Sequence, residues 1–285
     1  MPTFELGPNQ YGKAETRLVR VERAAGGDRI TDLNVSVALR GDLAASHLTG
    51  DNAAVLPTDT QKNTVYAFAR EHGIAGAEGF AARLAEHFVA TQPAIHEARV
   101  SIEEYPWSPV DAAHTFRRDG GEVRTAVVHH GPYGTQTVSG VKGLVLLKTT
   151  GSEFHGYVKD RYTTLPETRD RILATSVDAT WRGLEGCPDP AAARAALVEA
   201  FADTYSYALQ QTLFAMGSRV LQRCPEVVEV RLSLPNRHHF LVDLAPFGLD
   251  NPNEVYHAAD RPYGLIEGVV RRDGVEIPEE VAWTF

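Results

Sequence analysis

The sequence predicts an α+β protein built from two similar units, each an antiparallel sheet with helices on one face. Three observations lead to this class. Apolar residues alternate with polar ones in several short segments, as in half-buried strands. Apolar residues three to four positions apart indicate helices between those segments. The order strand pair, helices, strand pair then occurs once in each half of the chain, so we place the units at 1–133 and 134–285.

The first unit begins with a predicted hairpin. Residues 17–23 are rich in β-branched and charged side chains, and the alternation of Val35, Val37 and Leu39 gives the second strand. The run Ala-Ala-Gly-Gly-Asp at 24–28 provides the turn between them.

Two helices and two strands complete the first unit. Helical spacing of apolar residues predicts one helix within 61–72 and a second around 80–88. Alternation then predicts strands around 98–102 and 123–127, before a Gly-Pro-Tyr-Gly turn at 131–134.

The second unit starts with a predicted strand at 141–147, followed by an irregular polar segment over 151–186. Asp189 followed by Pro190 is typical of a helix start, because Asp caps free N–H groups and Pro suits the first turn. The apolar stripe that runs from there to Met216 predicts one long helix.

Two further strands are predicted at 228–234 and 240–244, with Pro235, Asn236 and Arg237 as their connection. Antiparallel sheets of this kind leave edge strands that can pair with another unit or subunit.

Composition excludes some classes of partner. The 285 residues are 43% apolar and 23% charged, which is ordinary for a globular protein. There are 37 acidic against 28 basic residues, a net charge of −9. This balance argues against a nucleic-acid partner and against a polybasic membrane anchor. It allows a small anionic ligand only where cations are placed locally.

Cysteine use and hydropathy predict a cytoplasmic protein. Cys187 and Cys224 lie outside any metal-type cluster, which favours a reducing compartment. Residues 1–11 lack the basic-then-apolar pattern of a signal peptide. The longest apolar stretch, 141–147, is too short to span a membrane.

Two polar segments of the first unit carry candidate site residues. Lys13 opens a strand, and it is either a solvated lysine or one whose pKa falls on burial so that it accepts a proton. The segment 56–64 reads as a helix start that Asp59 or Thr60 can cap. Free N–H groups at a helix start also suit an anion, and Thr58 could offer its hydroxyl there.

Two segments of the second unit carry further candidates. Arg171 is either a two-pronged clamp on a planar anion or the partner of a carboxylate such as Asp170. Phe154 is either a stacking face or a core residue. Gln210 lies within the predicted long helix, where glutamine is most often solvated.

The adjacent His238 and His239 fall on opposite faces of a strand, so at most one of them faces a given site. They indicate a metal only weakly, and no zinc motif, Gly-rich phosphate loop or Gly-x-Ser-x-Gly turn occurs. The residues by themselves indicate an enzyme that acts on a small anion.

Four longer motifs occur in order along the chain. They are Tyr-Gly-Lys-Ala-Glu-Thr-Arg-Leu at 11–18, Leu-Pro-Thr-Asp-Thr-Gln-Lys-Asn-Thr at 56–64, Tyr-Thr-Thr-Leu-Pro-Glu-Thr-Arg-Asp-Arg at 162–171 and Ser-Leu-Pro-Asn-Arg-His-His-Phe at 233–240. Together they resemble the urate oxidase (uricase) family over roughly residues 10–267.

The resemblance implies the tunnelling fold (T-fold), with two units per chain and four chains forming a barrel around a tunnel. It implies a homotetramer with active sites at subunit interfaces. The implied reaction, part of purine degradation, is the oxidation of urate by O2 and water to 5-hydroxyisourate and hydrogen peroxide. The family uses no metal and no organic cofactor.

The resemblance also implies a substrate-binding set. Arg171 and Gln210 would clamp the edge of urate, and Phe154 would stack on its face. Backbone N–H groups of Leu209 and Asp59 would complete the ring of contacts.

The catalytic residues implied by the resemblance are Lys13, Thr58 and His238, acting as a proton relay. The Thr58 hydroxyl would come from the neighbouring subunit and also contact the substrate. Asn236 would hold the O2 or water site above the urate plane, and Leu165 would line the pocket.

Two alternatives stay open. A pterin-acting enzyme of the same fold would favour a carboxylate anchor for its ring, and several such enzymes hold zinc with Cys and His. A non-catalytic purine-binding homologue would be expected to lose Lys13, Thr58 or His238, and all three residues are present.

Overall fold

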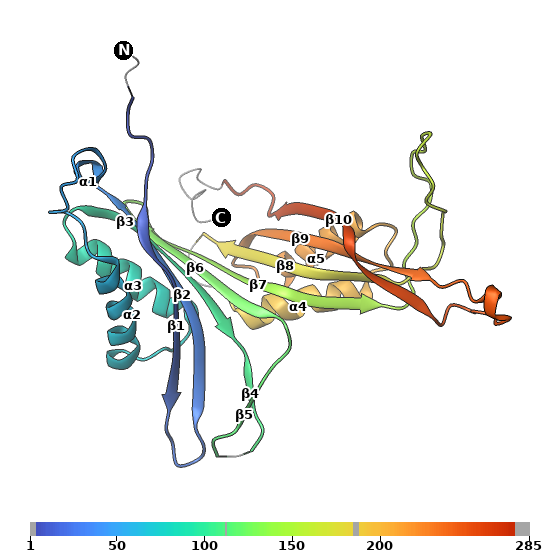
Figure 1. The fold of residues 1–285 in the computed structure, drawn as a ribbon, viewed down its shortest axis with the longest axis horizontal. Helices are drawn as coiled ribbons and strands as arrows, with labels where there is room; N and C mark the ends of the chain where they lie inside the picture. The colour runs from blue at the N-terminus through green and yellow to red at the C-terminus, as the bar shows by residue number, and fades with distance from the viewer. Residues whose placement is uncertain (1–3, 112, 185–187, 277–285) are drawn as a thin grey trace. The chain divides into compact units, whose positions relative to one another are not determined.

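The computed structural model describes residues 4–111, 113–184 and 188–276, which divide into two compact units (Figure 1). The first unit runs to Gly140 and includes 182–184. The second comprises Val141–Trp181 and Pro188–Val275. Each unit combines part of an antiparallel sheet with helices, so the predicted α+β class is confirmed.

The first unit builds its sheet in the order β1-β2-β3-β6, with β7 next. These neighbours up to β6 pair antiparallel. The bounds are β1 Tyr11–Glu22, β2 Arg29–Gly41, β3 Ile95–Tyr105, β6 Val123–Gly131 and β7 Gly134–Lys148. A short second sheet pairs β4 (Trp107–Pro109) with β5 (Phe116–Arg118).

Helices pack against this sheet because alternate strand residues are apolar. The predicted hairpin is confirmed as β1 and β2, in which Leu33, Val35 and Leu39 are fully buried. They share a core with Leu84 and Phe88 of the second long helix. The helices are α1 (Ala44–Leu48), α2 (Thr58–Glu71) and α3 (Ala77–Thr91), and the two predicted helices correspond to α2 and α3.

The second unit continues the strand order as β7-β8-β9-β10. The remaining elements are β8 Leu173–Gly183, α4 Pro190–Asp203, α5 Leu209–Arg223, β9 Val227–Leu241, the 3-10 turn η1 Ala245–Phe247 and β10 Tyr256–Arg271. Trp181, Leu197 and Met216 are central to its core. Helix α5 lies close on β10, because a Cβ on Gly217 would come within 2.5 Å of Val270 Cγ2.

The capping prediction at Asp189 is confirmed: its carboxylate accepts a hydrogen bond from the Ala191 N–H at 2.9 Å, and Pro190 opens α4. The single long helix predicted after it is wrong. The chain forms α4 and α5 with a break at 204–208 between them. Ser206 in that break uses both its N–H and its C=O to bond residues near 151–153, so it cannot continue a helix.

Two strand predictions are also wrong. The segment 151–186 is not irregular throughout, since it contains β8. The inward residues of β8 include Thr175 and Ala179, whose small or polar side chains hide the alternation. The predicted strands at 228–234 and 240–244 are instead one continuous strand, β9, which Pro235 does not interrupt. Its antiparallel partner is β10, a largely exposed strand without apolar alternation.

Candidate active site

The first set of site residues lies where β1 approaches the start of α2. The Tyr11 hydroxyl accepts a hydrogen bond from the Leu56 N–H at 3.0 Å and donates one to the Leu56 C=O at 3.2 Å. Burial raises the pKa of Tyr11, so its hydroxyl stays protonated and able to donate. These two bonds fix the chain just before Thr58 against the strand that carries Lys13.

Lys13 sits at an irregularity of β1. The register with β2 shifts between Lys13 and Thr16, and Glu15 in between has a φ of 56°. The Glu15 N–H bonds the Ser36 hydroxyl at 2.9 Å instead of a ladder carbonyl. Such bulges change the direction of neighbouring side chains. The Lys13 side chain is only half-buried.

The start of α2 is not capped as the sequence predicts. No side chain caps this helix, which begins at Thr58 after Pro57. Asp59 instead bonds Lys62 and, at 3.1 Å, the Asn63 amide. These contacts lower the pKa of Asp59, and the charge of Lys13 contributes a smaller part. Among the described residues, no side chain therefore occupies the first backbone N–H groups of this helix, and such groups suit an anionic partner.

The second set of site residues begins with a short extended segment, 151–154. On one side, the Phe154 N–H and C=O bond Thr168 at 2.8 and 3.0 Å. On the other, the Glu153 N–H bonds the Ser206 C=O at 2.9 Å. The Ser152 C=O accepts from the Arg171 N–H at 2.9 Å, so this segment holds its two neighbours together.

Arg171 and Phe154 are brought together by this pairing. The Arg171 guanidinium carbon lies 5.3 Å from the centre of the Phe154 ring, which is stacked at 4.9 Å on Tyr157. The Arg171 side chain is partly buried, and its Nε donates to the Ser152 hydroxyl at 3.3 Å. The ion pair with Asp170 that the sequence left open does not form: within the described part of the chain, no carboxylate pairs with Arg171.

Helix α5 places Leu209 and Gln210 in its first turn. Its N-cap residue, Ala208, offers no side-chain cap, so no cap occupies the first N–H groups of this turn in the described part of the chain. Gln211 turns back and accepts from the Tyr207 N–H at 2.9 Å. Gln210 is exposed, not buried in a helix interior, and its side-chain amide makes no hydrogen bond among the described residues. It therefore remains available to a ligand.

A buried pair of hydroxyl groups connects α5 to the segment that bonds Arg171. The Thr212 hydroxyl donates to the Ser206 hydroxyl at 2.8 Å, and both residues are fully buried. Ser206 forms a parallel bridge with the equally buried Ser152, which in turn bonds Arg171. These three residues were not predicted from the sequence. Serine and threonine give no recognisable sequence signal when their role is to connect backbone segments.

Asn236 and His238 lie on β9 beside a second irregularity. Asn236 pairs with Gly264 of β10 and His238 with Ala259, so residues 260–263 bulge opposite Arg237. Burial lowers the pKa of His238, and the positive charge of Arg171 lowers it further. His238 is therefore neutral near pH 7 and able to accept a proton.

The described residues contain no group of three or more His, Cys, Asp or Glu side chains that could hold a metal ion. Cys224 is a free, buried thiol, and Cys187 lies outside the described residues.

Comparison with known proteins decides the family. The family model described as Uricase matches residues 9–129 and 137–267. Uricase from Arthrobacter globiformis is 53% identical over 274 residues, covering 94% of this chain and 90% of that protein. The chain belongs to the uricase family. The resemblance found in the four sequence motifs is thereby confirmed.

Other uricases agree with this assignment. Uricase from Dictyostelium discoideum is 35% identical over 276 residues, covering 93% of this chain and 96% of that protein. The crystal structure of Arthrobacter globiformis uricase superposes with a TM-score of 0.94 at 50% identity, covering 99% of this chain and all of that one. No helix within the described residues of this uricase-family chain is both long and apolar enough to cross a membrane.

Proposed function

We propose that this chain is a urate oxidase: it oxidises urate with O2 and water to 5-hydroxyisourate and hydrogen peroxide. The observation that carries the proposal is the Arg171 guanidinium, partly buried over the Phe154 ring and free of any described carboxylate. A charged two-pronged donor over an aromatic face suits a flat anion such as urate. Membership of the uricase family supports this substrate.

The substrate-binding set follows from these contacts. Arg171 and the Gln210 amide would hold the edge of urate, because an amide offers both a donor and an acceptor beside the cation. Phe154 would stack on the purine plane, while the Leu209 and Asp59 N–H groups complete the ring of contacts. Leu165 would line the pocket, and Asn236 would hold O2 or water above the ring.

Lys13, Thr58 and His238 would form the proton relay. A threonine hydroxyl is too weakly acidic to give up a proton alone, so a neighbouring lysine must take it. The hydrogen bonds between Tyr11 and Leu56 support the pairing of Lys13 with Thr58, because they hold the strand of Lys13 against the segment before Thr58. The neutral His238 can then pass a proton onward.

The reaction in this proposal needs no metal and no organic cofactor. Urate is an electron-rich anion and can itself transfer electrons to O2 once deprotonated. The protein then only has to bind the substrate, remove its proton and hold O2 beside it.

We further propose that the active enzyme is a homotetramer of tandem T-fold units, residues 1–133 and 134–285, with sites shared between subunits. Thr58 of one subunit would face the Arg171 of another. The open edges at β1 and β10, with exposed Val19, Val21 and Val269, support contact between copies. The cysteine use supports a cytoplasmic location.

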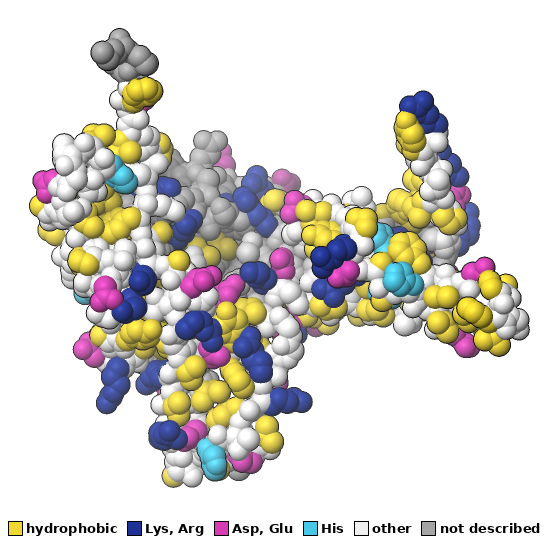
Figure 2. Space-filling model, in the orientation of Figure 1, with side chains coloured by type: hydrophobic (Ala, Val, Ile, Leu, Met, Phe, Trp, Pro, Cys, Tyr) yellow, Lys and Arg dark blue, Asp and Glu magenta, His cyan; other side chains and the backbone are white. Residues whose placement is uncertain are grey.

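The arm formed by 157–165 supports the same assembly. Figure 2 shows apolar and basic side chains gathered along it. Val158 is 94% exposed and Tyr162 is 71% exposed. Apolar side chains this exposed in a single chain are typical of an interface between subunits.

Oxidation of urate by chelator-treated protein tests the proposal. We expect the purified tetramer to consume urate and O2 and to release an equal amount of peroxide after exhaustive dialysis against a chelator. A correctly folded, metal-free tetramer that leaves urate untouched would overturn the assignment. The Arg171→Ala variant, which should bind urate poorly, serves as the control for background oxidation.

A further inference from the structure

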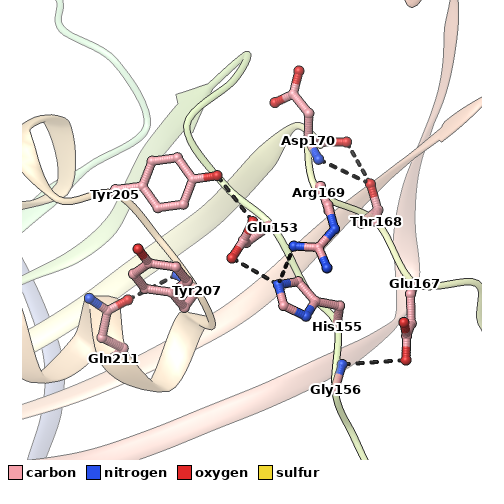
Figure 3. Close-up of polar contacts among 10 residues, drawn as sticks. All are labelled: Glu153, His155, Gly156, Glu167, Thr168, Arg169, Asp170, Tyr205, Tyr207 and Gln211. Atoms are coloured by element: carbon pink, nitrogen blue, oxygen red, sulfur yellow. Dashed lines mark hydrogen bonds and ion pairs between the residues drawn. The ribbon is translucent and has the colours of Figure 1, made fainter.

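A cluster of polar side chains beside Phe154 plays no part in the mechanism described above. Glu153 is only 8% exposed, although it carries a charge. Its Oε2 accepts from the Tyr205 hydroxyl at 3.2 Å, and its Oε1 lies 3.0 Å from His155 Nε2 (Figure 3). Because a buried carboxylate is costly unless it is hydrogen-bonded, these two contacts account for its position.

Of the two partners, Tyr205 is the unambiguous one. His155 Nε2 also lies 3.3 Å from Arg169 Nη1, and a guanidinium can only donate. One nitrogen cannot donate to Glu153 and accept from Arg169 at the same time. The Tyr205 hydroxyl, in contrast, has Glu153 as its acceptor. Burial raises the pKa of Tyr205, and the negative charge of Glu153 raises it further.

The contact joins two elements of the binding set. Glu153 immediately precedes Phe154, and Tyr205 lies in the segment that leads into the first turn of α5, where Gln210 sits. Next to this side-chain contact, the Glu153 N–H donates to the Ser206 C=O and the Ser206 N–H donates to the Gly151 C=O. Backbone and side-chain bonds therefore both hold the two segments together. Figure 3 shows Tyr205 and His155 reaching Glu153 from opposite directions.

We propose that Glu153 and Tyr205 are positioning residues, whose hydrogen bond sets the spacing between the Phe154–Arg171 pair and the start of α5 and so the affinity for a planar purine. The inference rests on the proposed function for its substrate class. It assigns no chemical step to Glu153, so affinity should change and turnover should not.

The test uses Tyr205→Phe, which removes one oxygen atom. Tyr207→Phe is the matched control, because this tyrosine is two residues away and its hydroxyl makes no hydrogen bond among the described residues. The probe is xanthine, a purine without the 8-oxo group, and its Kd is measured alongside KM and kcat for urate. We expect Tyr205→Phe to raise both Kd and KM by about three- to tenfold with kcat within about twofold.

Conservative replacement separates positioning from general stability. Glu153→Gln keeps an oxygen that can accept from Tyr205, so it should retain more xanthine affinity than Glu153→Leu. The double variant Glu153→Leu with Tyr205→Phe should be no worse than Glu153→Leu alone, since both remove the same contact. If Glu153→Leu fails to fold, the xanthine Kd of Tyr205→Phe still tests the inference.

Two results would overturn the inference. One is a Tyr205→Phe variant that binds xanthine as Tyr207→Phe does. The other is a fall in kcat with unchanged Kd, which would place Glu153 in the chemistry. If the unmodified chain binds xanthine but does not oxidise urate, the proposed function fails while the binding comparison still tests the inference.

Discussion

Single residues of the candidate site owe their properties to one or two neighbours each. Arg171 stays available because it bonds a serine hydroxyl and lies over a phenyl ring instead of pairing with a carboxylate. His238 is neutral because it is partly buried and faces that same cation. In the proposed site, a positive charge available for binding and a neutral base available for proton transfer would therefore lie close together.

Lys13→Met should separate catalysis from binding. Loss of a general base typically slows turnover by about 10²- to 10⁴-fold. Since the lysine is proposed to activate Thr58 and not to hold the purine, the Kd for xanthine should change by less than about threefold. Steady-state kinetics and calorimetric titration measure the two quantities. Equal effects on both would identify Lys13 as a binding residue.

The state of His238 should depend on Arg171. The pKa of His238 is lowered from 6.5, so the imidazole is still mainly neutral at pH 6.5. It becomes protonated as the pH falls through the lowered pKa. Turnover should fall with it, because a protonated imidazole cannot accept a proton. NMR titration of labelled histidines, with His238→Asn to assign the signal, gives the midpoint. Arg171→Gln should raise this midpoint while leaving it below 6.5, because burial is the larger cause. A midpoint that Arg171→Gln leaves unmoved would contradict the electrostatic coupling.

At the scale of elements, the candidate residues sit at irregular points of regular structure. Lys13 lies at a bulge of β1, and His238 pairs with the residue of β10 that immediately precedes a bulge. Both α2 and α5 begin without a side-chain cap. Uncapped helix starts leave N–H groups for a ligand, and bulges turn side chains out of the sheet pattern.

Tyr11→Phe should disturb the start of α2. The change removes both bonds to Leu56, so we expect a loss of about 1 kcal/mol in stability. We also expect kcat to fall about threefold or more, because small displacements of a catalytic group are costly. Thermal unfolding and steady-state kinetics measure the two effects.

Tyr66→Phe is the matched control for this change. The Tyr66 hydroxyl also links α2 to β1, by donating to the Arg17 C=O at 3.2 Å, but in an exposed place away from Thr58. The Tyr66→Phe variant should leave kcat unchanged. If both variants lose activity alike, Tyr11 has no special role at the site.

At the scale of the whole molecule, a net charge of −9 surrounds a site proposed for an anion. In that proposal the electrostatic attraction must be local, and it would come from Arg171 and from the N–H groups at the starts of α2 and α5, which no side chain caps. Within the described residues, Lys13 belongs to the first unit and Arg171 to the second. The proposed assembly combines them from different chains.

Mixed tetramers should test this sharing of sites. Lys13→Met and Arg171→Ala subunits are each expected to be inactive alone. When they are co-expressed, a site formed by the intact first unit of one chain and the intact second unit of another is complete. Random assembly should restore about a quarter of the sites. Activity of the purified mixed tetramer, compared with either parent, gives the answer. No recovery in verified mixed tetramers would mean that each site is built by a single chain.

Much of the fold follows from local patterns in the sequence. The hairpin at 17–39, helices α2 and α3 and the cap at Asp189 follow from local spacing and local chemistry, which a short window contains. The four ordered motifs determined the family, because long runs of specific residues rarely recur by chance. They also contain Arg171 and His238, which the resemblance implies as site residues.

The remaining features depend on contacts between segments that are distant in the sequence. β8 and β10 were missed because their burial depends on partners distant in the sequence. Ser206 separates α4 from α5 because its backbone N–H donates to the Gly151 C=O and its C=O accepts from the Glu153 N–H. Contacts across the fold also explain three properties of the site. They are the lack of a described carboxylate partner for Arg171, the lowered pKa of His238 and the buried Glu153–Tyr205 contact. Local patterns carry no record of such contacts, since they form only when the chain folds and excludes water from them.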